Sequence, residues 1–514
     1  MKKYVKDAFD IDEYTGNGIT KIFLIAGVCS GKSTYVKEVL AQKGSVLFVI
    51  SRKAKAEADI SNSTFSDVIK WNTEGNRTLI TNAGLAKRIE NISLNTSKDI
   101  NDFINHFDYI VVDEVHSIAS DSLFADSCPT LLSFIEYVAD MGKPIICMTG
   151  TPEPMQKYFE ENNWHILNYL NVCNYVHPSQ VILIQKYNVI DLIRKKSQNN
   201  KIIYFANRTQ SIKEFCKELL NGILEAHEIS ISVSKSRETE IFGSLKNALN
   251  NNEYFEKIQN ASEQTYESII NNRLLPEECK ILFSTSTLKE GIDIDNENVV
   301  MFCENHVLSN LIQYFGRARR SNTTVYIIED SPEHNNTHNE LLYSYAINAE
   351  VKAANYFYET KIKNEQSPLI ARKQDQFIEY ISKNPYIYFD VLQNKFRVFD
   401  IKYNEGKRLQ NNFNWKSKLF QYCSRYGISV IYVGKEFAKE ALYRMALKES
   451  KLYGEQYITT IQHLLYIAYG ISKKQPQKIN ELLHSINANI KIKYGKGTKG
   501  DTRNITYWQV VFVQ

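Results

Sequence analysis

The sequence lacks the cysteine spacing that a zinc site or a disulfide framework requires. Its eight cysteines lie at 29, 128, 147, 173, 216, 279, 303 and 423, and no two of them form a Cys-x-x-Cys pair. The first residues lack the apolar core of a secretion signal, and no run of about 18 apolar residues occurs. We therefore expect a reduced, cytoplasmic protein without a membrane-spanning segment.

The chain as a whole has little excess of positive or negative charge, but its charges are unevenly distributed along the sequence. The net charge is +4 over 514 residues, a length that predicts about three domains. Residues 336–514 contain 27 Lys and Arg against 15 Asp and Glu, a net of +12, so residues 1–335 carry −8. The basic part predicts a surface that binds a polyanion, and a solvated lysine-rich surface is the alternative.

Short apolar runs alternate with helical patterns along residues 1–335. The runs occupy 22–25, 46–50, 78–80, 109–112 and 144–148, and then 181–184, 202–205, 281–283, 299–302 and 325–328. Such runs are typical of parallel sheets covered by helices on both faces. The pattern predicts two α/β lobes, residues 1–180 and 181–335, with a polar helical insertion near 234–279 in the second lobe.

The pattern changes after residue 335, where aromatic-rich amphipathic helices replace the strands. We expect residues 336–514 to form a mainly helical, basic accessory domain. A helical pattern at 478–486 precedes two short strands, at 489–494 and 505–513, which suggests a winged-helix-like end. In this hairpin Lys496, Lys499 and Arg503 are expected to contact nucleic-acid phosphates, unless the hairpin binds a protein partner.

A phosphate loop follows the first apolar run and precedes a helical pattern. The loop reads Ala26, Gly27, Val28, Cys29, Ser30, Gly31, Lys32, Ser33 and Thr34. Its amides and the following helix N-terminus hold negative charge, while Lys32 reaches the outer phosphates and the Ser33 hydroxyl can hold Mg²⁺. Cys29 is expected to be a packing residue, with a reactive thiol as the alternative.

Two carboxylates follow the apolar run 109–112. Ligands bind at the carboxyl ends of parallel strands, so we expect Asp113 to hold Mg²⁺ and Glu114 to polarise an attacking water. His116 is either a buried hydrogen-bonding residue or a link between the hydrolysis site and the second lobe.

A second cationic element lies far downstream of the phosphate loop. The stretch Gln-x-x-Gly-Arg-x-x-Arg begins at Gln313 and contains Arg317 and Arg320. Arginines of this kind supply the positive charge that a phosphoryl-transfer transition state needs from outside the phosphate loop. The combination predicts a nucleotide site that closes between two lobes, and hence a motor or a switch.

With these motifs, residues 20–330 resemble the superfamily 2 helicases of the DExH group, here with the sequence Asp-Glu-Val-His. The resemblance implies two tandem RecA-like lobes that use ATP and Mg²⁺ and bind nucleic acid. It also implies that Arg317 and Arg320 contact the γ-phosphate, and that Gly291 and Asp293 face the nucleotide. The two threonines of Thr149-Gly150-Thr151 match the motif that couples hydrolysis to nucleic-acid binding in that family.

Three further positions match the residues with which that family touches the bound strand: Arg52, Thr81 and Thr285. The resemblance predicts an ATP-dependent helicase or translocase. DNA is favoured over RNA because the tail resembles a winged helix and no glutamine, which DEAD-box proteins use to read adenine, precedes the phosphate loop.

Two alternatives stay open at this point. Little room exists between Asp293 and Gln313 for a strand-separating hairpin, which favours an ATP-gated binding switch. The chain can also be a subunit of a larger defence, restriction or replication assembly, with its C-terminal region bound to a protein partner.

Overall fold

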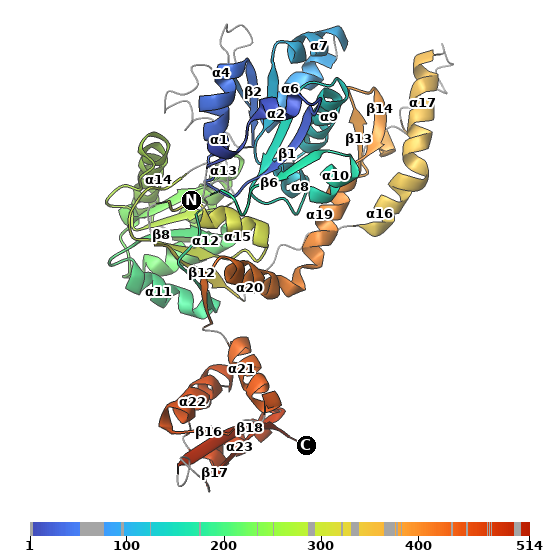
Figure 1. Ribbon diagram of the computed structural model, residues 1–514. Helices are drawn as coiled ribbons and strands as arrows, with labels where there is room; N and C mark the ends of the chain where they lie inside the picture. The colour runs from blue at the N-terminus through green and yellow to red at the C-terminus, as the bar shows by residue number, and fades with distance from the viewer. Residues whose placement is uncertain are drawn as a thin grey trace.

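The computed structural model describes residues 4–51, 77–93, 97–123, 125–173, 176–233, 235–249, 251–285, 293–319, 322–329, 339–363, 376, 379–381, 383–432, 435–448, 451–469, 471, 473, 475–497 and 505–513. Two α/β lobes lie against each other, and a smaller C-terminal module lies apart from them (Figure 1). The predicted class, tandem lobes with parallel sheets, is confirmed.

Lobe 1 contains a six-stranded sheet in the order β3-β2-β4-β5-β1-β6, and every neighbouring pair is parallel. The strands are β1 (Lys21–Ile25), β2 (Val46–Ile50), β3 (Arg77–Thr81), β4 (Tyr109–Val112), β5 (Ile145–Thr149) and β6 (His165–Asn168). The helices are α1 (Val5–Ala8), α2 (Ile11–Thr15), α3 (Lys32–Tyr35), η1 (Val36–Leu40), α4 (Ala41–Lys43), α6 (Asn82–Ser93), α7 (Ser97–Asn105), α8 (Ser117–Asp121), α9 (Ser127–Asp140) and α10 (Gln156–Glu161).

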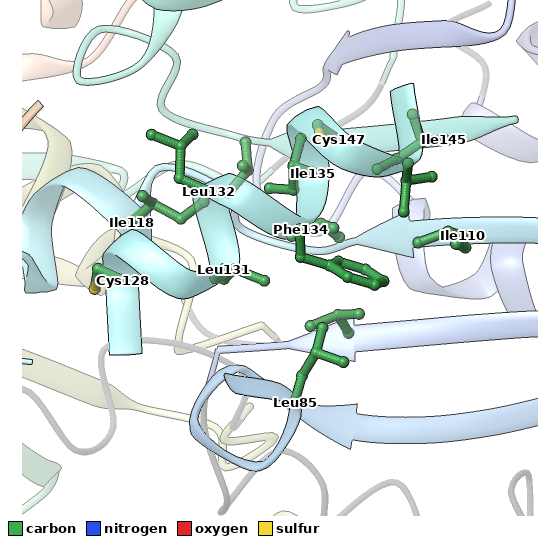
Figure 2. Packing of buried hydrophobic residues seen from close by; sticks show 14 of the residues in the cluster. Leu85, Ile110, Ile118, Cys128, Leu131, Leu132, Phe134, Ile135, Ile145 and Cys147 are labelled. Carbon is green, nitrogen blue, oxygen red and sulfur yellow. The ribbon is translucent and has the colours of Figure 1, made fainter. Parts of the chain in front are cut away.

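Both faces of this sheet are covered, which explains its continuous apolar strands. On β4, Ile110 enters the core beneath α6, α7 and α9, whereas Val111 enters the core beneath α1, α3 and η1. Figure 2 shows the first of these cores, with Phe134 of α9 beside Ile110 and with Ile145 on the neighbouring strand. Each large side chain buried in this way contributes about 1.5–3 kcal/mol to the stability of the lobe.

Lobe 2 contains a seven-stranded parallel sheet in the order β15-β7-β12-β11-β8-β10-β9. The strands are β7 (Gln180–Ile184), β8 (Lys201–Phe205), β9 (Ile229–Ser232), β10 (Ile281–Ser284), β11 (Val299–Cys303), β12 (Thr324–Ile328) and β15 (Ser429–Tyr432). The helices are η2 (Lys186–Asn188), α11 (Val189–Lys196), α12 (Thr209–Leu219), η3 (Ala226–Glu228), α13 (Lys235–Leu249), α14 (Asn252–Asn272) and α15 (Leu308–Phe315).

The segment expected to be a helical insertion forms α13 and α14, and α14 is an integral part of lobe 2. The Ser262 hydroxyl on α14 accepts a hydrogen bond from the Ile231 amide at 2.9 Å, and the hydroxyls of Ser230 and Thr265 lie 2.8 Å apart. Ile269 of the same helix is buried in the core of the lobe. Although its sequence is largely polar, α14 therefore packs directly on strand β9.

The described residues of 339–432 form a strap that contacts both lobes. Its elements are α16 (Glu340–Tyr345), η5 (Ala346–Glu350), α17 (Val351–Lys363), β13 (Ile387–Asp390), β14 (Lys395–Val398), α19 (Asp400–Gln410), η6 (Asn412–Asn414), α20 (Trp415–Arg425) and β15. On lobe 1, the Tyr388 and Ser133 hydroxyls lie 3.1 Å apart, and Arg397 Nη1 lies 2.5 Å from the Glu136 carboxylate. On lobe 2, Trp415 is buried in the core and β15 pairs with β7. The sheet of lobe 2 thus extends beyond residue 335, because its edge strand comes from the region predicted to be a separate accessory domain.

The C-terminal module has a core of its own. It consists of α21 (Lys435–Lys448), β16 (Leu452–Tyr453), α22 (Glu455–Tyr469), α23 (Pro476–Ser485), β17 (Ile490–Lys496) and β18 (Thr506–Phe512). The strands form an antiparallel sheet in the order β16-β18-β17. The predicted helix and hairpin correspond to α23, β17 and β18. Within the described ranges, no helix of the chain is long and apolar enough to cross a bilayer.

Candidate nucleotide site between the lobes

The phosphate loop turns sharply between β1 and α3. Gly31 has φ 86° and Cys29 has φ 63°, both in the left-handed region that glycine adopts without strain. The Lys32 ammonium lies inside this turn, where it donates to the carbonyl oxygens of Ala26 at 2.8 Å and Gly27 at 3.0 Å. The loop thus holds a buried cation at the N-terminus of a helix, a position that attracts phosphate.

The carboxylates that follow β4 meet this loop. The Ser33 hydroxyl lies 3.3 Å from Asp113 Oδ2, and Asp113 is buried. Oxygen atoms of this kind are the ligands that Mg²⁺ prefers, so this pair fits the ion. Among the described residues, no group of three or more His, Cys, Asp and Glu side chains could hold a metal alone. Phosphate oxygens and water would therefore have to complete the coordination.

Glu114 projects into the site from a left-handed backbone conformation, with φ 48°. Its carboxylate lies 3.8 Å from the Lys32 ammonium and 3.2 Å from His116 Nδ1. The same His116 nitrogen lies 2.9 Å from the Thr149 hydroxyl, which accepts a hydrogen bond from the Thr151 amide at 3.0 Å. His116 therefore connects Glu114 with the Thr149–Thr151 turn inside lobe 1.

Lobe 2 reaches this network through α15. Gln313 Nε2 lies 3.4 Å from Glu114 Oε2 and 3.4 Å from the Thr151 hydroxyl. Arg317 donates to the Gln313 carbonyl at 2.9 Å and lies 3.6 Å from an oxygen of Asp293. The glutamine of the distant motif thus touches the carboxylate expected to act on water.

A cavity of about 490 Å³ lies between the two lobes beside this contact. Its walls contain most of the predicted nucleotide residues, from Ser30 to Thr34 together with Glu114, Asp293 and Arg317. Sequence reasoning missed seven further residues of the wall: Tyr4, Lys6, Lys37, Val176, Ile269, Arg273 and Arg319. The signal for Arg319 was available, because it lies inside the predicted arginine motif, whereas nothing in the local sequence indicated that α14 reaches the cavity.

Cys29 forms another contact between the lobes. Its thiol donates to the Gly316 carbonyl oxygen at 3.4 Å. Burial raises the pKa of this thiol above its ordinary value, and the Asp293 carboxylate adds to the effect. The packing role expected for Cys29 is therefore favoured over the reactive thiol.

Among the described residues, the predicted nucleic-acid contacts Thr81, Thr285 and Lys496 do not line this cavity. Thr81 accepts a hydrogen bond from the Gly84 amide at 3.1 Å at the end of β3, and Thr285 is buried after β10. Lys496 lies at the end of β17 in the C-terminal module. Five predicted site residues lie outside the described residues: Arg52, Gly291, Arg320, Lys499 and Arg503.

Part of lobe 2 matches a known protein family. Residues 185–322 match the family model of the helicase conserved C-terminal domain, a segment that runs from the end of β7 to the start of β12. No curated protein matches the chain. The matched segment includes Asp293, Gln313 and Arg317, so the lobe 2 wall of the cavity lies within the matched segment.

Several solved helicase structures are similar to the chain at low sequence identity. Saccharomyces cerevisiae Dbp5 bound to RNA and ADP BeF3 is 13% identical, with 60% of this chain and 80% of that chain covered and a TM-score of 0.40. The Escherichia coli DEAH/RHA helicase HrpB is 10% identical, with coverages of 68% and 46% and a TM-score of 0.42. The DUF1998 helicase MrfA bound to DNA is 12% identical, with coverages of 77% and 60% and a TM-score of 0.39.

Proposed function

We propose that this protein is an ATP-dependent nucleic-acid helicase or translocase that hydrolyses ATP between its two lobes. The observation that carries the proposal is the contact of Gln313 on lobe 2 with Glu114 and Thr151 on lobe 1. A site whose parts come from two lobes is complete only when the lobes are together. Hydrolysis can then be coupled to lobe movement, because each state has its own affinity for nucleic acid.

The residues around the cavity suit phosphoryl transfer to water. Lys32 and the amides of the phosphate loop would hold the outer phosphates, and Ser33 and Asp113 would hold Mg²⁺. The Mg²⁺ ion would neutralise phosphate charge. Glu114 would orient the attacking water and accept its proton.

Arg317 is the cation from lobe 2 that would stabilise the charge developing on the transferred phosphoryl group. Its guanidinium is held by the Gln313 carbonyl and by Asp293, so it is oriented before the reaction begins. Gln313 would transmit the state of the Glu114 site to lobe 2. His116 would transmit the state of the Glu114 site to the Thr149–Thr151 turn of lobe 1.

For the nucleic acid, we favour DNA over RNA because the C-terminal module has the helix and basic hairpin of a winged-helix-like unit. Phosphate contacts by the predicted residues, Arg52, Thr81, Thr285, Lys496, Lys499 and Arg503, would give affinity without sequence preference. A protein partner of the C-terminal region is the competing interpretation.

The test is the rate of ATP hydrolysis without nucleic acid and with single-stranded DNA, duplex DNA and RNA, each at equal nucleotide concentration. We expect stimulation by nucleic acid, and strongest stimulation by DNA. An ATPase rate that no nucleic acid changes would refute the proposed coupling.

The second candidate function is an ATP-gated binding switch in a larger assembly. It is supported by the short connection between β11 and α15, where residues 304–307 leave no room for a strand-separating hairpin. A strand-displacement assay separates the two candidates, because a switch binds and releases nucleic acid without separating strands.

A further inference from the structure

The three-stranded sheet of the C-terminal module has one face turned away from its helices. Ile490 and Ile492 of β17 and Trp508 and Val510 of β18 enter the module core, together with residues of α21, α22 and α23. Because side chains alternate along a strand, the residues between them lie on the opposite face. We call this opposite side the outer sheet face; it contains Lys451, Tyr453, Lys491, Lys493, Tyr507, Gln509 and the buried Val511.

Tyrosine rings occupy one row of the outer sheet face. Tyr453 pairs with Tyr507, and Tyr507 pairs with Gly495. The ring centroids of the two tyrosines lie 5.3 Å apart. A Cβ atom at Gly495 would lie 3.1 Å from the Tyr507 ring, so this ring lies close over the glycine and would have to shift over a larger residue. The row therefore places two adjacent aromatic rings, tilted by 55° to each other, on this face.

Lysines flank the aromatic row. The Lys451 ammonium lies 4.7 Å from the centroid of the Tyr507 ring, a cation–π distance. On the other side of Gln509, Lys493 is exposed, and Lys491 follows on the same face. None of the three strand sequences contains Asp or Glu. The outer sheet face thus combines positive charge with aromatic rings.

The charge of the whole module points in the same direction. Residues 435–514 contain 13 Lys and Arg against 6 Asp and Glu, a net of +7, which is more than half of the +12 carried by residues 336–514. A surface of this kind attracts phosphates, and the partly exposed rings of Tyr453 and Tyr507 offer stacking to bases. Only unpaired bases present their faces to such rings, since bases in a duplex are already stacked on one another.

We propose that the outer sheet face binds single-stranded nucleic acid, with Tyr507 and Tyr453 stacking on bases and Lys451, Lys491 and Lys493 contacting phosphates. The proposal rests on the proposed function for the identity of the ligand. It adds a second binding surface to the module, separate from the hairpin-turn residues, and a preference for unpaired strands. A module with this preference would hold the strand on which the lobes act.

The test measures binding of labelled oligonucleotides of about 16 nucleotides to the full chain by fluorescence anisotropy, without nucleotide. Single-stranded DNA, single-stranded RNA and duplex DNA are compared. We expect Tyr507→Ala to weaken single-strand binding about tenfold and duplex binding by less than about twofold. Tyr507→Phe keeps the ring and should bind as the unaltered chain does. Tyr466→Ala is the matched control, because Tyr466 is a 58% exposed tyrosine on α22, away from this face.

A second pair of variants keeps the proposal testable if Tyr507→Ala impairs folding of the hairpin. The double variant Lys451→Gln, Lys493→Gln should reduce the slope of log affinity against log salt by about 1.4 for single strands. The control Lys195→Gln, Lys473→Gln removes the same charge from exposed sites elsewhere and should leave the slope unchanged.

Two results would overturn the proposal: single-strand binding unchanged in the Lys451, Lys493 double variant, or equal losses for single strands and duplex in Tyr507→Ala. If Tyr507→Ala weakens the binding of single-stranded DNA and of single-stranded RNA by the same factor, the site recognises bases by stacking alone. Failure of the proposed function is distinguishable, because it is measured as absent or unstimulated ATP hydrolysis. The binding assay contains no ATP.

Discussion

Gly316 of lobe 2 lies directly against Val28 of the phosphate loop. A Cβ atom built on Gly316 would lie 2.2 Å from Val28 Cγ1, far inside the sum of their van der Waals radii. On the other side of the same valine, a Cβ atom on Gly150 would lie 3.3 Å from Val28 Cγ2. Gly316 therefore allows lobe 2 to meet the phosphate loop, and Gly150 allows the same valine to pack within lobe 1.

We expect Gly316→Ala to lower ATP turnover by about 10²-fold, because the added methyl group pushes lobe 2 away from the phosphate loop and misplaces Arg317. The backbone at Gly316 has φ −78°, which alanine adopts freely, so the effect should be steric. Nucleotide binding to lobe 1 should change little. The matched control is Gly243→Ala, since a Cβ atom there meets nothing within 4 Å. Normal turnover in Gly316→Ala would show that the lobes do not close at this contact.

Replacing Lys32 and Glu114 should separate binding from chemistry. We expect Lys32→Ala to abolish turnover, because the outer phosphates lose their main side-chain cation. Glu114→Gln should retain nucleotide binding and lower turnover by about 10²-fold or more, because the water is no longer activated. Single-turnover hydrolysis and equilibrium binding of a labelled nucleotide measure the two effects. Near-normal hydrolysis in Glu114→Gln would remove that residue from its role.

Arg317→Ala should lower turnover by about 10³-fold, the scale of an arginine that stabilises phosphoryl transfer. The affinity for nucleotide should fall much less, because the phosphate loop is intact. Arg194→Ala, which removes an exposed arginine of α11, is the control and should have no effect. If Arg317→Ala hydrolyses ATP at the normal rate, the arginine is structural and the two-lobe site is incorrect.

The contact of the strap with lobe 1 should depend on Arg397. Its guanidinium lies 2.5 Å from Glu136 and 2.9 Å from Asp390, and the Asp390 side chain is fully buried. Arg397→Ala leaves that buried carboxylate without its cation, at a cost of about 3 kcal/mol. Hydrogen exchange in β13 and β14 should accelerate and the first thermal transition should fall. Arg425→Ala, at an exposed arginine of α20, should change neither.

Cys29 should react slowly with alkylating reagents at pH 7. Burial keeps the pKa of its thiol above the ordinary value, so the thiolate that reacts is scarce at this pH and increases only as the pH rises. The other seven cysteines are buried. Mass spectrometry of the alkylated chain over a pH series measures the rate at each site. Rapid labelling of Cys29 at pH 7 would show that the interlobe contact is mostly open in solution.

The local sequence predicted the fold class and the lobe 1 half of the site because their signals are short-range. An apolar strand followed by a glycine turn and a lysine places Lys32 at a helix N-terminus, and a strand that ends in Asp113 and Glu114 places both at the same sheet edge. Because β1 and β4 belong to one parallel sheet, their carboxyl ends lie at the same edge, which brings Lys32 and the two carboxylates together. These positions require no knowledge of distant partners.

The parts that escaped prediction depend on long-range pairing. β15 joins the sheet of lobe 2 beside β7, about 250 residues earlier in the chain. Its four residues look like any short apolar run after a helix. The approach of Ile269 and Arg273 to the cavity likewise follows from the packing of α14 on β9. Neither feature has a spacing or composition of its own that a single sequence reveals.

The strap has a mechanical consequence for any movement of the lobes. The chain passes between the lobes at residues 176–179 and passes again at η6, after β13 and β14 have been fixed to lobe 1 and before α20 and β15 are fixed to lobe 2. The chain also returns from lobe 2 to lobe 1 between β12 and β13, so the lobes are joined at three places, which together restrain sliding and twisting of one lobe against the other. Each time the two lobes open at the phosphate loop, they would therefore follow a similar path and close again in the same relative position.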